Sequence, residues 1–356
     1  MTRSRGPAPR APGRPAGFVL PTVLVVTSVV TLIFLVAITA LASLNREAGL
    51  ARARVTFAQQ AMTAEARLTY LGATERVGPR SLAIDAPLPP GEFETLDPER
   101  LAAFQAGMAN ATDLRLDNRP YRYGSSAIIR LQDQAGMVNL SRLSGPALRR
   151  LLARLNVSAA GARSLEAALA DYADPDDLRT SGGAERGDYP DGSDAPANRP
   201  LRTADEFLNV LGAREAVDMA AWREMRPFLA ADATSFQVNV NTADFEALRI
   251  LFGMSEAQAR AAIRGREVEP FYSLAQAVAD TGAALDTNPE IGSVYPSGRI
   301  IYTIEDSLSR WTYTGRLNLT PTNVERPFWI DRTEYSEARR PDPEPVNAPE
   351  FPAAPR

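Results

Sequence analysis

The longest apolar stretch of the chain lies near its start. No charged residue occurs among the 27 residues from Phe18 to Leu44, FVLPTVLVVTSVVTLIFLVAITALASL. As a helix with a rise of about 1.5 Å per residue, this stretch measures about 40 Å, more than the ~30 Å core of a bilayer. A cleaved secretory signal has an apolar region of only about 7–15 residues. The pattern therefore predicts a retained membrane anchor; the alternative is a signal cut after Ala40-Leu41-Ala42.

An apolar stripe continues beyond this stretch at alternating steps of four and three residues, through Leu44, Ala48, Ala51, Val55, Ala58 and Met62. These steps are typical of one face of an amphipathic helix. The pattern reaches about Leu71 before Gly72 and the Gly78-Pro79 break end it. We therefore predict one helix over 18–71, half in lipid and half packed on a soluble domain. An anchor followed by a separate amphipathic helix is the alternative.

The rest of the chain alternates between strand and helix patterns. A strand is predicted over 126–133, and three more over 299–304, 311–319 and 328–333. The segments LRRLLARL and SLEAALADYA between them are amphipathic helices. Strands interrupted by a long helical block predict an α+β fold, with an antiparallel sheet and a large inserted all-α domain. The predicted parts are a leader 1–17, the helix 18–71, an α/β part 72–137, a helical insert 138–230, a second helical unit 238–281, C-terminal strands 282–340 and a disordered tail 341–356.

The two helical units resemble each other in sequence. Val138-Asn139 and Val240-Asn241 each open a unit, and Ser158-x-x-x-Ala-Arg matches Ser255-x-x-x-Ala-Arg at an offset of 97. Further along, Thr203 matches Ser273, and the offset has fallen to 70. The difference of 27 residues is extra chain between Arg163 and Thr203. This segment is therefore an insertion into a repeated helical module, and such insertions often carry function.

Composition excludes several kinds of chemistry. The 356 residues include no Cys and no His, and all 39 basic residues are Arg. A Ser-His-Asp triad, a cysteine nucleophile, a thiolate zinc site and a disulfide are therefore impossible. The net charge of −4 gives no support to a nucleic-acid partner, which needs a basic face. A hard-cation site or a carboxylate hydrolase stays open, although no acid pair stands in an apolar setting that would raise one pKa.

The insertion is acidic and rich in glycine. From Asp171 to Asp194 it reads DYADPDDLRTSGGAERGDYPDGSD and holds eight carboxylates: Asp171, Asp174, Asp176, Asp177, Glu185, Asp188, Asp191 and Asp194. Such a cluster repels itself unless it is solvated or neutralised. Calcium takes six to eight oxygens in a flexible geometry, which a loop of this kind can supply. The spacing is not that of an EF-hand, so from the residues alone a solvated acidic loop is the favoured interpretation.

The N-terminal region resembles the processing site of type IV pilins and pseudopilins. A basic, acid-free leader with four arginines ends at Gly17, and Phe18 opens the apolar helix. In that family the prepilin peptidase cuts between this glycine and phenylalanine and N-methylates the new terminus, while the helix is kept as anchor and assembly core. Most members carry glutamate at the fifth mature position, where this chain has Thr22. A subunit at the very tip has no earlier neighbour whose ammonium such a carboxylate would neutralise.

Within that family the chain is most similar to the minor pseudopilin K of type II secretion, the general secretion pathway protein K family. The resemblance implies a structural, non-enzymatic tip subunit, held in the inner membrane by one helix with a cytoplasmic N-terminus and a periplasmic head. Other minor pseudopilins, the prepilin peptidase and secreted exoproteins are the implied partners. It also implies calcium in the acidic loop, with Asp174, Asp176 and Glu185 as first ligands and Asp171, Asp177 and Asp188 in reserve. Tyr172 stands where the family often has Trp.

The second helical unit also resembles the helix-hairpin-helix modules of DNA-binding and competence proteins. In those modules a Gly-hydrophobic-Gly hairpin presents backbone N–H groups to a phosphate. Here Gly253-Met254-Ser255 lacks the second glycine, and 238–280 holds four arginines against six acids. We therefore expect no nucleic-acid partner and interpret this unit as structural. A membrane-anchored DNA-uptake protein and an exported calcium-binding protein are the alternative functions.

Overall fold

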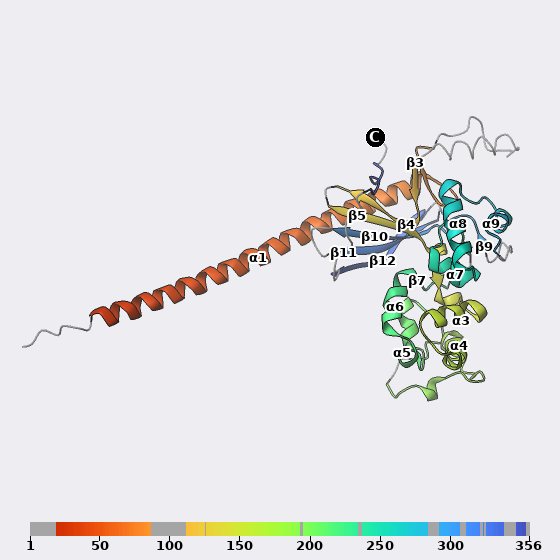
Figure 1. Ribbon diagram of the computed structural model, residues 1–356, viewed down its shortest axis with the longest axis horizontal. Helices are drawn as coiled ribbons and strands as arrows, with labels where there is room; N and C mark the ends of the chain where they lie inside the picture. The colour runs from red at the N-terminus through yellow and green to blue at the C-terminus, as the bar shows by residue number, and fades with distance from the viewer. Residues whose placement is uncertain are drawn as a thin grey trace, which may run out of the picture. The chain divides into compact units, whose positions relative to one another are not determined.

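The computed structural model describes residues 19–86, 112–124, 126–192, 195–233, 237–283, 292–306, 311–320, 323, 325–337 and 347–353. The α-helices in these ranges are α1 (Val19–Thr74), α3 (Gly145–Arg154), α4 (Ala159–Ala173), α5 (Ala213–Ala216), α6 (Met219–Met225), α7 (Phe245–Phe252), α8 (Glu256–Val268) and α9 (Leu274–Thr281) (Figure 1). The strands are β1 (Arg76–Val77), β2 (Ser81–Ile84), β3 (Thr112–Arg115), β4 (Asp117–Tyr123), β5 (Ala127–Asp133), β6 (Val138–Asn139), β7 (Leu229–Ala230), β8 (Val238–Asn239), β9 (Gly292–Ser293), β10 (Arg299–Asp306), β11 (Trp311–Leu319) and β12 (Phe328–Glu337). The α+β class predicted from the sequence is confirmed.

Helix α1 is continuous from Val19 to Thr74, which confirms the single long helix. Within the described ranges it is the one helix long and apolar enough to cross a membrane. By its internal contacts the chain divides into two units, residues 1–58 and residues 59–356. The membrane-length part of α1 belongs to the first unit, and its last turns belong to the second.

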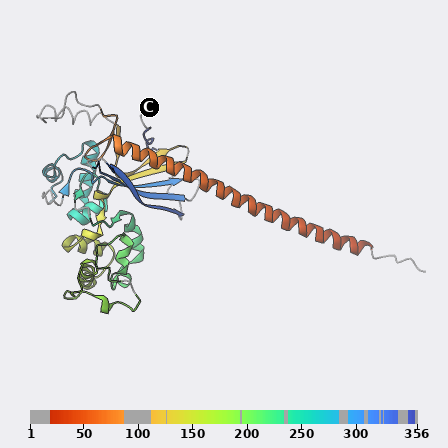
Figure 2. The same ribbon diagram turned by 180° about the vertical axis from the view of Figure 1, so that it is seen from behind.

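Five antiparallel strands form the main sheet, in the order β12-β11-β10-β5-β4 (Figure 2). The last turns of α1 pack on one face of this sheet, where Gly72 lets the helix approach Leu317 closely. Glu65 accepts hydrogen bonds there from the hydroxyls of Tyr302 and Tyr313. Gly315 is required beneath this contact, because a Cβ atom would lie 2.1 Å from the Tyr302 hydroxyl. The predicted strands of the C-terminal part are confirmed, with β12 four residues longer than expected.

Each helical unit opens with a short strand in a parallel pair. Strand β6 pairs with β7 in the first unit, and β8 pairs with β9 in the second. The structural counterpart of Val138 is therefore Val238 rather than Val240, which corrects the match read from the sequence by two residues. The positions Ser158 and Ser255 do correspond, since each begins a helix as its N-cap.

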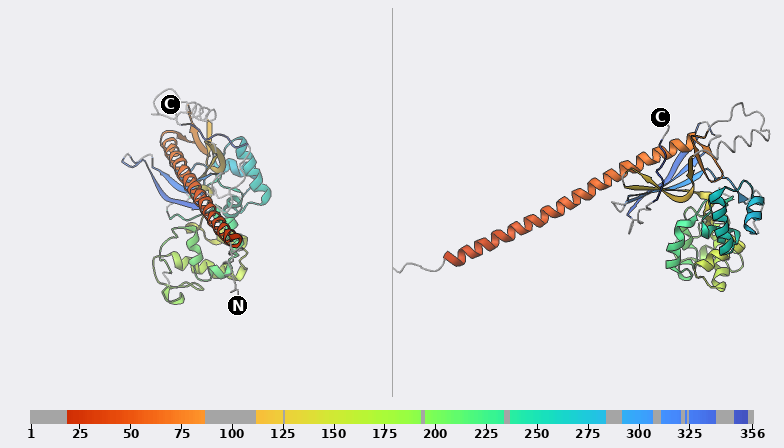
Figure 3. Two further views of the ribbon diagram at one scale, coloured as in Figure 1. Left: turned by 90° about the vertical axis from the view of Figure 1, so that its left-hand side faces the viewer. Right: turned by 45° about the horizontal axis from the view of Figure 1, so that its top comes forward.

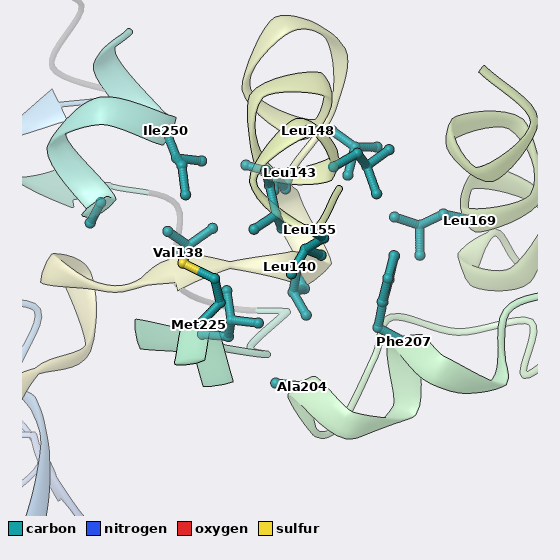
Figure 4. Close-up of a cluster of buried hydrophobic side chains, with 14 of the residues drawn as sticks. Val138, Leu140, Leu143, Leu148, Leu155, Leu169, Ala204, Phe207, Met225 and Ile250 are labelled. Carbon is teal, nitrogen blue, oxygen red and sulfur yellow. The ribbon is translucent and has the colours of Figure 1, made fainter. Parts of the chain in front are cut away.

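The two units share one hydrophobic core that runs from Val138 to Val294. Figure 4 shows Leu140, Leu155 and Phe207 of the first unit and Ile250 of the second unit among the buried side chains of this core. Figure 3 shows α3–α6 in yellow-green and green and α7–α9 in teal, both beside the sheet. Side chains at helical spacing in α3 and α7 enter this core, as amphipathic helices require.

A buried carboxylate joins the sheet to the second helical unit. Asp133, at the end of β5, accepts hydrogen bonds from Thr242 Oγ1 at 2.8 Å and from Ser297 Oγ at 2.8 Å. Burial raises the pKa of Asp133, while the bonds from Ser297 and Thr242 oppose that shift. The backbone at Gly136 comes so close to Thr242 that a Cβ atom would lie 2.5 Å from the Thr242 carbonyl oxygen, so glycine is needed there.

The prediction of a disordered tail over 341–356 is wrong for residues 347–353. Arg122 of β4 donates its N–H to the Pro349 oxygen, and Phe351 donates its N–H to the Arg122 oxygen, both at 2.8 Å. The Phe351 ring is buried edge-on against Tyr121 and Tyr123. Proline content suggested disorder, but one aromatic anchor and an open strand edge suffice to order this segment.

Candidate functional site

The acidic insertion follows the last turn of α4 and occupies residues 174–202 before the next helical turn. In the second unit the equivalent connection, between α8 and α9, needs only residues 269–272. Gly182 turns the insertion in the left-handed conformation with φ +83°, and a 3-10 turn follows at Arg186–Asp188. The extra chain lies where the repeat analysis placed it.

Asp171 fixes the insertion to α4. Its side chain is fully buried, and its two carboxylate oxygens accept the Thr180 N–H at 3.2 and 3.1 Å. Gly183 passes so close to Asp171 that a Cβ atom would lie 2.0 Å from its Oδ2. Gly183 therefore lets the loop close over this carboxylate.

Two further carboxylates have buried oxygens without a hydrogen-bond partner. Asp174 Oδ1 and both oxygens of Glu185 are buried and make no hydrogen bond. Burial raises the pKa of Glu185 first, and the charges of Asp171 and Asp174 raise it further. The pKa of Asp174 is raised by burial and then by Asp176 and Asp171. Buried oxygens of this kind are costly unless something neutralises them.

The remaining acids of the loop differ in their surroundings. Asp176 accepts the Leu178 N–H at 2.8 Å, and Asp177 accepts from Asn198 Nδ2 at 2.8 Å, but the charges of both still raise the pKa of Glu185. Asp188 instead pairs with Arg179 at 3.1 Å and accepts the Glu185 N–H at 3.0 Å. The charges of Asp171, Asp174, Asp176 and Asp177 thus all act on Glu185, whereas Asp188 is paired with Arg179.

Asn198 belongs to the same cluster and was not predicted from the sequence. Its backbone has φ +47°, its N–H bonds the Tyr172 oxygen at 3.0 Å, and its Oδ1 is buried without a hydrogen-bond partner. Asparagine tolerates this left-handed conformation better than most residues. An asparagine directly after an acidic, glycine-rich run was the available signal.

The donor set is that of a hard cation, with carboxylate and amide oxygens and no nitrogen or sulfur. In the described part of the chain, no three carboxylates stand close enough to hold a metal ion by themselves. A cation at this site would need the Asn198 oxygen, main-chain carbonyls or water besides the acids. The orphaned oxygens of Asp174, Glu185 and Asn198 fit such a group, since each lacks any other partner.

The hairpin of the second helical unit faces the protein. Arg150 of α3 donates from Nε to the Ile250 oxygen at 2.7 Å and from Nη2 to the Leu251 oxygen at 3.2 Å. Its guanidinium lies against Gly253, the left-handed residue that ends α7. The first unit therefore fills the space in front of the hairpin. The predicted cleavage site, Gly17 and Phe18, lies outside the described residues.

Two of three comparisons with known proteins find a similar protein. Residues 128–234 match the family model of type II secretion system (T2SS) protein K. A chain from the crystal structure of the GspK-GspI-GspJ complex from the enterotoxigenic Escherichia coli Type 2 Secretion System matches at 20% identity. The match covers 62% of this chain and 84% of that chain, with a TM-score of 0.48. A search of curated proteins gives no match.

The fold is an α+β fold, with one long apolar helix and a helical insert. Over residues 128–234 the chain is similar to protein K of the type II secretion system, the family that its sequence resemblance predicted. The family match spans the first helical unit with its acidic insertion and the strand that leads into it.

Proposed function

We propose that this protein is the tip-capping minor pseudopilin of a type II secretion system, which starts the pseudopilus and supports export of folded proteins across the outer membrane. The observation that carries this proposal is the combination of the protein K match over 128–234 with an apolar helix that runs unbroken into the head. A removable signal gives no reason for such continuity.

The mechanism is mechanical. Before assembly, α1 rests in the inner membrane with the leader in the cytoplasm and the head in the periplasm. Helix α1 then leaves lipid when packing against sister helices becomes more favourable than lipid contact. The helical insert enlarges the head, so that no further subunit can dock above it. Other minor pseudopilins are the proposed neighbours, and exoproteins are the proposed contacts of the head.

Thr22 supports a place at the tip. A buried carboxylate in an assembled bundle needs a cationic partner. Among the residues from Phe18 to Leu44 there is no acid that would neutralise the terminal ammonium of an earlier subunit. A first subunit has no earlier subunit whose ammonium must be neutralised, and this chain lacks the carboxylate that would do so.

The processing step provides the direct test. In the variant Gly17→Leu, we expect an uncleaved precursor and loss of exoprotein secretion in the native host. Gly13→Leu, four residues earlier in the leader, is the matched control and should be processed normally. Mass spectrometry of the mature N-terminus would show a methylated Phe18. A mature protein from Gly17→Leu, or one that begins after Ala42, would contradict the pseudopilin assignment.

We also propose that the acidic insertion binds one calcium ion. Asp174, Glu185 and Asn198 would supply the oxygens that now lack partners, with Asp171, Asp176 and Asp177 around them; Asp188, paired with Arg179, is the least suited of the predicted ligands. The ion would neutralise the repulsion among these carboxylates and hold the insertion closed. Its role would be structural.

Titration calorimetry with CaCl₂ on the detergent-solubilised chain tests this proposal. Glu185→Gln should weaken binding at least tenfold. Asp191→Asn, an exposed acid of the same insertion, should leave binding unchanged. A chelator should speed proteolysis within 174–198. Absence of a binding heat, or equal binding by both variants, would overturn the calcium assignment while leaving the pseudopilin role intact.

A further inference from the structure

A short segment near the C-terminus lies on the outer edge of β4. Arg122 donates its N–H to the Pro349 oxygen, and its own carbonyl oxygen accepts the Phe351 N–H, both at 2.8 Å. The two strands meet in one parallel bridge, between Arg122 and Glu350. Addition of an extended segment to a sheet edge is a recurring way in which domains bind peptides. Residues 347–353 therefore make with their own chain the kind of contact that a partner's peptide would make.

One aromatic side chain anchors this segment in a pocket. Phe351 is 4% exposed, and its ring lies edge-on to Tyr121 and Tyr123, with centroids 6.3 and 6.0 Å away. The Arg67 guanidinium of α1 lies 5.7 Å from the ring centroids of both Phe351 and Tyr123. Edge-to-face rings and a cation over a ring face are favourable only for an aromatic group, so this pocket selects an aromatic side chain.

Contacts outside the segment hold the walls of the pocket. Tyr121 and Tyr123 belong to the ladder that β4 forms with β5. The Tyr121 hydroxyl also accepts the Arg115 N–H of β3 at 2.6 Å. The pocket therefore keeps its shape when the segment leaves. A site that is formed before its ligand arrives binds with little cost in ordering.

The segment itself is held by few contacts. Two of its seven residues are buried, and Phe351 is one of them. Pro349 and Pro352 have no N–H to donate, which limits the ladder with β4. The ion pair between Arg122 and Glu350, at 2.9 Å, is exposed on both sides and adds little stability. Segments with few buried contacts open at a low cost in free energy, so this one can leave while the sheet stays folded.

The segment also leaves space beside itself. A cavity of about 310 Å³ lies between Pro349, Pro352 and the residues of β3 and β4. The site is thus larger than its present occupant fills, and a bulkier peptide finds room there. Arginines and acids line the cavity in equal number, so it selects no charge: Arg80, Arg115 and Arg119 against Asp113, Glu267 and Glu350.

From these observations we propose that the outer edge of β4 is a peptide-binding site and that residues 347–353 are its built-in competitor. The ligand is an extended segment of a partner protein in which a glutamate precedes an aromatic residue, as Glu350 precedes Phe351. Its aromatic side chain replaces Phe351 in the pocket, and its glutamate takes over the pair with Arg122. The chain's own segment keeps the edge covered until then, which prevents unspecific strand pairing. This inference goes beyond the proposed function and holds whether or not the insertion binds calcium.

Fluorescence polarisation on the detergent-solubilised full chain tests this proposal with a dye-labelled peptide of residues 347–353, NAPEFPA. The wild type should bind it weakly, because the tethered segment competes at a high effective concentration. The full-chain variant Phe351→Ala should bind it at least tenfold more tightly. Phe328→Ala, which removes an exposed aromatic side chain from β12, is the matched control and should bind like the wild type. A second peptide, with alanine in place of the phenylalanine, should bind to none of these chains.

Hydrogen exchange shows whether the peptide displaces the segment. Peptide in excess of the effective concentration, on the order of millimolar, should speed amide exchange at Phe351 of the wild-type chain and leave β4 protected. Strands β5 and β10 should be as protected in Phe351→Ala as in the wild type, which shows that the variant is folded.

Three results would overturn the proposal. The first is binding to Phe351→Ala that is no tighter than binding to the wild type. The second is exchange at Phe351 of the wild type that excess peptide leaves unchanged. The third is loss of protection in β5 and β10 of Phe351→Ala, which would make the segment a part of the core fold. Self-association of the wild type that Phe351→Ala abolishes would show that two copies exchange their segments, and would equally refute a partner's peptide as the ligand.

Discussion

The two helical units are built on one plan and differ in one connection. In each, a short strand leads to a helix, a serine N-cap begins a second helix, and a further helical turn follows. The second unit closes this plan with residues 269–272, in which buried Phe271 fills the space. The first unit replaces those four residues with the acidic insertion 174–202.

Two asparagines show what this difference means. Asn241 of the second unit is buried, and its side chain donates to the Phe271 and Val294 oxygens and accepts the Phe271 N–H. Asn198 of the first unit donates its backbone N–H to the Tyr172 oxygen, yet its side-chain oxygen has no hydrogen-bond partner. In the short connection of the second unit, the N–H and C=O groups of Phe271 therefore both have a hydrogen-bond partner. The unsatisfied oxygens of the insertion are the observation on which the calcium proposal rests.

The largest expected effect concerns the core that both units share. Phe207 is fully buried and stacks on Trp222 with ring centroids 5.6 Å apart. Phe207→Ala should lower the free energy of unfolding by about 3–5 kcal/mol, because it leaves a cavity where the insertion rejoins the module. Urea denaturation followed by circular dichroism measures this loss. The control is Val268→Ala, whose side chain is 88% exposed and which should change the free energy of unfolding by no more than about 0.5 kcal/mol. If Val268→Ala cost as much as Phe207→Ala, the helical units would not be tightly packed.

The helix N-caps of α3 and α7 give a pH-dependent difference between the units. Ser144 precedes α3, whereas Asp244 caps α7 by accepting the Ala247 N–H at 2.7 Å. Burial raises the pKa of Asp244 from 3.8 to about 6, against the opposing effect of the hydrogen bonds at Ala247 and Glu246 and of the Arg266 charge. Protonation of Asp244 therefore favours folding. This contribution is complete below about pH 4 and is lost as the pH rises through about 6.

Asp244→Asn keeps the cap and removes the titration. Relative to the wild type, this variant should gain about 1–3 kcal/mol between pH 4 and pH 7, since each pKa unit corresponds to about 1.4 kcal/mol. Urea denaturation at both pH values gives the difference. Ser144→Asn in the first unit is the matched control, with no such change. If the stability difference between Asp244→Asn and the wild type were the same at pH 4 and pH 7, the pKa of Asp244 would not be raised by folding.

One substitution should have opposite effects in the two helical units. Gly183→Ala places a methyl group against the buried carboxylate of Asp171 and should cost about 1–3 kcal/mol through overpacking. Gly265→Ala lies inside α8, where the new Cβ would meet only the Phe271 ring, at 3.5 Å. There the change should stabilise by about 0.5–1 kcal/mol, because glycine weakens a helix interior. Thermal unfolding compares them, and equal shifts would refute the close approach at Gly183.

Periodicity predicted much of this molecule because large faces are buried in it. The run of α1 and strands β5, β10 and β11 follow directly from alternation and helical spacing. The internal repeat located the insertion, and its acids led to the calcium prediction, which stays a prediction. Asn198 was missed because a single left-handed residue has no periodic signal. The order of residues 347–353 was missed because their partner strand lies 226 residues away from Ala348 and the contact depends on one phenylalanine.

The smallest expected effect compares the serine caps of α4 and α8. Ser158 Oγ accepts the Gly161 N–H at 3.1 Å, and Ser255 Oγ accepts the Gln258 N–H at 3.3 Å. Ser255 also donates its own N–H to Gln258 Oε1 at 2.9 Å, which completes a capping box. Because alanine retains that N–H, Ser255→Ala removes one bond only, as Ser158→Ala does. Each should cost about 1 kcal/mol, seen as faster amide exchange at Gly161 or Gln258. If Ser255→Ala cost more than twice as much stability as Ser158→Ala, the two hydrogen bonds of the capping box would be cooperative. The second unit would then depend on its cap where the first depends on its insertion.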